Sequence, residues 1–96
     1  MVKHVVMWKF KEENKEANMK KARELLLALP PVISEIKKME VHLDVLHTAA
    51  SMDVMLETEF LNTNDLSIYA VHPEHLKVAE FMKSVVETRV VLDCEI

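Results

Sequence analysis

The stretch KHVVMWKF (Lys3–Phe10) decides the fold, because it predicts a β-strand that is apolar on both sides. Valine and aromatic residues favour strands, and alternate residues of a strand share one face. One face carries His4, Val6, Trp8 and Phe10. Val5 and Met7 fall on the other face. A strand with two apolar faces belongs in the middle of a sheet, so we expect Lys3–Phe10 to be central.

The segments that follow show the periods of a helix and then of two strands. Lys15–Leu29 carries apolar residues at three- and four-residue steps, which predicts a helix that Pro30–Pro31 ends. Met39–Val45 and Met52–Phe60 each alternate apolar and polar residues. A short polar link joins these two segments, so they predict an antiparallel hairpin.

The last third of the chain predicts two helices and a closing strand. Asn62–Asp65 supplies helix caps, and the short helix that follows ends at about Val71. Pro73 suits the first position of a second helix, which runs to about Ser84. Thr88–Ile96 alternates again and predicts the last strand.

The order of these elements predicts an α+β, ferredoxin-like βαββαβ fold with a four-stranded antiparallel sheet. A chain of 96 residues makes one domain of this kind, spanning residues 1–96. The helices can cover only one face of the sheet, and the other face is also apolar. A second copy would cover it, so we expect a homodimer whose paired sheets form an α+β barrel, with a pocket on the inner face of the sheet.

The composition narrows the possible partners. Lys and Arg number 12 against 16 Asp and Glu, without a basic stripe, so we expect no binding to nucleic acid or to an anionic membrane. The chain has no glycine, which excludes the glycine-dependent phosphate loops. It shows no signal peptide and no apolar run that would cross a bilayer, and its one cysteine, Cys94, cannot form an internal disulfide. We therefore expect a cytoplasmic protein.

The segment SIYAVHPEH (Ser67–His75) concentrates the residues that argue for a site. Histidine is the side chain whose unperturbed pKa lies near neutrality, so His72 and His75 are candidates for proton chemistry. Tyr69 can donate a hydrogen bond to a carbonyl oxygen.

Three stretches resemble the stress-responsive A/B-barrel domain family, often abbreviated Dabb. Val2–Lys11 looks like the first strand of that family, and Tyr69–His75 resembles its motif before the last helix. Val90–Ile96 resembles its final strand, although this chain has Asp93-Cys94 where Asp-Tyr is common. The resemblance covers the whole chain in the same order, and its motifs are specific only in combination.

The resemblance implies a dimeric α+β barrel and no single activity. Many members are known only as stress-induced proteins, and some plant relatives are polyketide cyclases that catalyse an intramolecular aldol condensation without a cofactor. Other members of the wider fold are metal-free monooxygenases or haem-degrading enzymes. The working residues of the cyclases map onto His4, Tyr69, His75 and Asp93, and all four residue types are kept.

Chemistry suggests a role for each catalytic candidate. His75 would be a general base, Asp93 would orient its ring, and Tyr69 would stabilise an enolate or carbonyl oxygen. The alternative for His75 is a purely structural place at the start of a helix, with Asp93 merely holding it.

Three further residues are candidates for ligand binding. His4 and Trp8 share a strand face and would line a pocket, although both could instead be packed structurally. His72 is the weaker candidate, because a residue directly before Pro73 is often a cap. His72 and His75 have HxxH spacing, but a zinc site brings three or four ligands, so we expect no metal and no cofactor.

The sequence therefore predicts a protein that binds a small, largely apolar carbonyl compound, with possible cyclase-like or lyase-like acid/base chemistry. One alternative is a non-enzymatic stress-related structural or assembly protein. A second alternative is a cofactor-independent monooxygenase.

Overall fold

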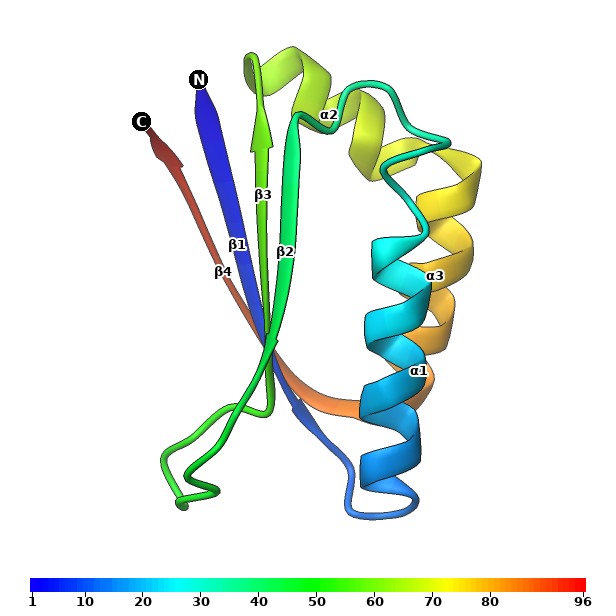
Figure 1. Cartoon of the computed structure of the whole chain (residues 1–96), viewed down its shortest axis with the longest axis vertical. Helices are drawn as coiled ribbons and strands as arrows, with labels where there is room; N and C mark the ends of the chain where they lie inside the picture. Colours follow the sequence, from blue (N-terminus) through cyan, green and yellow to red (C-terminus); the bar gives the residue numbers. More distant parts are fainter.

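A computed structural model describes all 96 residues and contains one four-stranded antiparallel sheet with helices on one face (Figure 1). The strand order in the sheet is β2-β3-β1-β4, so the first strand is central and the predicted ferredoxin-like fold is confirmed. The elements are β1 (Val2–Phe10), α1 (Lys15–Leu27), β2 (Lys38–Leu43), β3 (Val54–Phe60), α2 (Thr63–Val71), α3 (Pro73–Val85) and β4 (Val86–Glu95).

The hairpin strands β2 and β3 are shorter than their alternating sequence predicts. The aspartates at these two ends are joined by a backbone hydrogen bond from the Asp44 N–H to the Asp53 carbonyl oxygen (2.9 Å), and their carboxylates make further bonds. The Asp44 carboxylate accepts a 2.6 Å hydrogen bond from the His47 backbone N–H, which starts the turn. The buried Asp53 carboxylate accepts a 2.7 Å bond from the backbone N–H of Phe10, which ties the hairpin to the end of β1. Side-chain hydrogen bonds therefore set these two strand ends.

A sharp break separates α2 from α3 and brings two parts of the predicted motif together. His72 is extended, and its Nδ1 accepts a 3.1 Å hydrogen bond from the Glu74 backbone N–H, so it caps α3. Pro73 occupies the first turn of α3, where its missing N–H costs nothing. At the other end of α2, Asn62 caps the helix by accepting a bond from Asp65.

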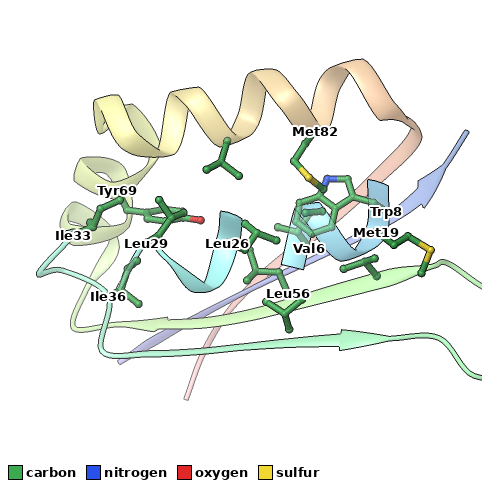
Figure 2. Close-up of a cluster of buried hydrophobic side chains, with 14 of the residues drawn as sticks. Val6, Trp8, Met19, Leu26, Leu29, Ile33, Ile36, Leu56, Tyr69 and Met82 are labelled. Atoms are coloured by element: carbon green, nitrogen blue, oxygen red, sulfur yellow. The ribbon is translucent and has the colours of Figure 1, made fainter. Parts of the chain in front are cut away.

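The two faces of the sheet have different surroundings. The even-numbered residues of β1 are on the face that the helices cover, and Val6, Trp8 and Phe10 join a buried cluster with Leu26, Leu56, Tyr69 and Met82 (Figure 2). The opposite face carries no helix (Figure 1). There Met7 and Val90 pair in register, as do Val5 and Leu92, and the Leu92 residue is 64% exposed. The chain thus leaves an uncovered apolar surface along β1 and β4, which we call the open face.

None of the three helices has the length and the apolar composition that would let it cross a bilayer.

Candidate functional site

A cavity of about 420 Å³ lies between the helices and the sheet of one chain. The helix-covered side of β1 lines this cavity, so it lies on the opposite side of the sheet from the open face. A pocket enclosed by a dimeric barrel stays a prediction. Its apolar walls come from β1, β3, β4, α1 and α3. They are Val6, Trp8, Leu26, Leu56, Val78, Ala79, Met82 and Val86. The polar lining residues are His4, Tyr69, His75, Lys83, Glu87, Thr88 and Arg89.

Tyr69, from the last turns of α2, is the most deeply buried polar group of the cavity. The residue is 1% exposed, its ring packs 5.1 Å from that of Phe60, and its hydroxyl has no hydrogen-bond partner. In Figure 2 this hydroxyl points into the space between the helices and the sheet. Burial raises the pKa of Tyr69 to about 12, against a smaller opposing effect of Arg89. The hydroxyl therefore stays protonated at neutral pH and remains available as a donor.

His75, in the first turn of α3, stacks beside Tyr69 with ring centroids 4.3 Å apart. Its Nδ1 lies 3.0 Å from the Ala70 carbonyl oxygen. A carbonyl only accepts, so Nδ1 carries the proton and Nε2 has a free lone pair. Burial is the main cause that lowers the pKa of His75, opposed by the bond to Ala70 and assisted by nearby positive groups. The ring is therefore a neutral base at pH 7.

Asp93 does not orient His75, which corrects the pairing expected from the sequence. Its carboxylate lies 2.5 Å from Nδ1 of His4. His4 and Asp93 are direct partners in the β1–β4 register, so their side chains meet on the same face of the sheet. The Nδ1 of His75 is already taken by the Ala70 carbonyl oxygen. The structure therefore has two separately oriented histidines, and Asp93 reaches the cavity only through His4.

The other two predicted binding residues have different positions. Trp8 lines the cavity and is 5% exposed, so it lies where a ligand would contact it. His72 does not line the cavity, because its Nδ1 is used to cap α3. In the HxxH pair of His72 and His75, each Nδ1 has a backbone partner, so only the two Nε2 atoms are without one.

Three charged residues at the cavity are not among those predicted from the sequence: Lys83, Glu87 and Arg89. A signal for Arg89 was present, because it lies four residues before Asp93 in a strand and therefore shares its face. Exposed charges at alternate positions usually face solvent, so only the folded structure distinguishes this arginine from an ordinary surface residue.

A second polar cluster lies on β2 and β3, on the same side of the sheet as the open face and away from the cavity. Glu40, His42 and Glu57 gather there with their ligand-type atoms within 4.8 Å of one another. Lys38 Nζ lies 3.2 Å from the Glu40 carboxylate, and His42 Nε2 lies 3.0 Å from it. These two side chains already supply donors to Glu40.

The comparisons with known proteins agree with this fold. A family model described as the stress responsive A/B barrel domain matches residues 2–96. No match was found among curated proteins. Among solved structures, a dimeric protein of unknown function with a ferredoxin-like fold from Bacteroides fragilis is 34% identical, with a TM-score of 0.90. That match covers 99% of this chain and 95% of the other.

Two more distant structures share the fold. A dimeric ferredoxin-like protein of unknown function from Thermobifida fusca is 17% identical with a TM-score of 0.89, covering 99% of this chain and 90% of that one. A hydroxynitrile lyase from Passiflora edulis is 20% identical with a TM-score of 0.88, covering 99% of this chain and 92% of that one. At these identities the similarity shows the fold alone.

Proposed function

The chain belongs to the family of stress responsive A/B barrel domains, and on that basis we propose that it is a cofactor-free enzyme acting on a small, largely apolar carbonyl compound. The proposed chemistry is proton transfer at a carbon next to the carbonyl group. One observation carries the proposal: the Tyr69 hydroxyl is buried and unpaired, and Tyr69 lines the cavity beside the ring of His75. An unpaired buried donor costs stability, so a ligand oxygen at this position has a ready partner.

In the proposed reaction, the Tyr69 hydroxyl donates to the carbonyl oxygen of the substrate. Nε2 of His75 takes a proton from the adjacent carbon, and the electron pair of that C–H bond forms the double bond of an enolate. The negative charge moves to the oxygen that Tyr69 holds, where a donor in an apolar cavity stabilises it most. His75 then carries two ring protons and returns one when the enolate carbon has reacted.

The His4–Asp93 pair gives the cavity a second oriented nitrogen. The Asp93 carboxylate only accepts, so it fixes the proton of His4 on Nδ1 and leaves Nε2 as an acceptor. We assign to Nε2 of His4 the binding of a hydroxyl or enol group on the substrate, across the cavity from the base. A hydroxynitrile lyase from Passiflora edulis has the same fold, so this fold can house an enzyme.

Deuterium exchange tests the reaction without knowledge of the natural substrate. The protein is incubated with 2-heptanone in deuterium oxide, and NMR follows the loss of the protons next to the carbonyl. We expect exchange above the protein-free rate, and a loss of about 10²-fold or more in His75→Ala, as is typical when a general base is removed. His47→Ala is the matched control, because the His47 side chain is 69% exposed in a loop and does not line the cavity.

Equal exchange in the wild type and in His75→Ala would reject the proposed base. If the ketone binds in the cavity beside Trp8 and no exchange occurs, the chain is a non-enzymatic binding protein and not an enzyme.

We also infer that the chain forms a homodimer through the open face. Two structures with this fold, from Bacteroides fragilis and Thermobifida fusca, are described as dimeric. Leu92 and Val90 leave apolar side chains exposed on the edge strand β4, beside the central strand β1, where a second copy would bury them. Because the cavity lies on the other face of the sheet, each chain of such a dimer would keep its own site.

A further inference from the structure

Arg89 brings a full positive charge to the cavity without a carboxylate partner. It lies on β4 directly opposite Trp8 in the β1–β4 register, on the face that the helices cover. It lines the cavity, and it takes part in none of the ion pairs of the structure. The other arginine of the chain, Arg23, is exposed on α1 and does not line the cavity. Arg89 is therefore the one guanidinium group that a bound ligand would contact.

The charge of Arg89 acts on both proposed reacting residues. It opposes the burial that raises the pKa of Tyr69, and it adds to the burial that lowers the pKa of His75. Lys83 of α3 also lines the cavity and is unpaired, whereas Glu87 is the single carboxylate of the lining. The cavity thus combines apolar walls with two free cations and one anion, and the balance favours a negatively charged ligand.

We propose that the ligand is an oxo acid, whose carbonyl group binds at Tyr69 and whose carboxylate group binds at Arg89. This inference rests on the proposed function and adds the class of substrate. A planar guanidinium matches a carboxylate with two parallel hydrogen bonds, which a hydrated lysine does not provide. The volume of about 420 Å³ suits a short aliphatic chain between the two groups. Lys83 would also attract the carboxylate by its charge, but it would not form the two parallel hydrogen bonds.

Ligand binding can be followed by the fluorescence of Trp8, because it is the only tryptophan and lines the cavity. Its fluorescence is titrated with 7-oxooctanoate and with the methyl ester of the same acid, which has the same chain and no charge. We expect the acid to bind the wild type about three- to tenfold more tightly than the ester, as for one partly exposed charge-assisted contact. We expect this preference to disappear in Arg89→Gln and to persist in Arg23→Gln, which makes the same change elsewhere.

A second measurement on the wild type does not depend on the fold of any variant. The preference for the acid should shrink when the ionic strength rises from about 0.02 M to about 0.5 M, since salt screens a contact at the mouth of a cavity. Arg89→Lys should keep part of the preference, because it keeps the charge and loses the planar geometry.

Equal affinity for acid and ester in the wild type would overturn the oxo-acid assignment and leave the proposed function standing. A preference that persists unchanged in Arg89→Gln would overturn the role of Arg89. If neither compound binds, the proposed function fails together with this inference.

Discussion

At the scale of single residues, the cavity depends on a hydroxyl that the folded chain does not use. Tyr69 is 1% exposed, and its oxygen has no partner within the protein. A buried polar atom in this condition destabilises the fold, and it persists where function requires it.

Tyr69→Phe should therefore be at least as stable as the wild type and should lose function. Removing the unpaired hydroxyl relieves a desolvation cost of about 1 kcal/mol, and the ring keeps its packing against Phe60. Urea denaturation measures the stability, and the exchange of 2-heptanone measures the function. A clear loss of stability would instead mean that the hydroxyl has a structural partner.

The pH dependence of the exchange reports on His75. Burial lowers its pKa below 6.5, the ordinary value for histidine, so the free base should persist below that pH. The exchange rate should therefore fall to half of its maximal value at a pH below 6.5. The free energy of unfolding also falls as the pH falls. Well above pH 6.5 the ring is neutral in the folded and in the unfolded chain, and as the pH falls through 6.5 the unfolded chain binds more protons than the folded one, so stability falls.

That stability loss should be smaller in His75→Gln, which has no titrating ring. Denaturation midpoints at several pH values between about 5 and 8 give the comparison. A wild-type exchange rate whose half-maximal value lies above pH 6.5 would contradict the direction of the shift.

At the scale of elements, the sequence predicts the strands and helices well and their contacts less well. The two-face pattern of Lys3–Phe10 correctly predicted a central strand, and Pro73 correctly marked the start of α3. The ends of β2 and β3 were wrong, because Asp44 and Asp53 use side-chain bonds that periodicity does not describe.

For the site as well, the sequence predicted where residues lie better than it predicted which residues they contact. Periodicity placed His4 on the buried face of β1, and a resemblance pointed to Tyr69 and His75. The partner of Asp93 was wrong, because strand register decides it and the register of β1 with β4 is a long-range property. The sequence predicted the break before Pro73, but the 4.3 Å separation of the ring centroids of Tyr69 and His75 follows from how α2 and α3 pack.

At the scale of the whole molecule, the open face predicts the assembly. Leu92→Glu should convert the homodimer into a monomer, because it introduces a charge into an apolar surface that the second copy would bury. Sedimentation equilibrium measures the mass. Leu76→Glu is the matched control, since Leu76 is also exposed but lies on α3, away from the open face. A wild-type protein that sediments as a monomer would contradict this assembly.

The alternation of β1 has a consequence for how such a protein changes over time. Its even-numbered residues line the core and the cavity, and its odd-numbered residues form the open face. Substitutions at even positions alter the chemistry inside one chain, and substitutions at odd positions alter its choice of partner. The two traits can therefore diverge separately within nine residues, whereas the insertion or deletion of one residue would exchange both at once.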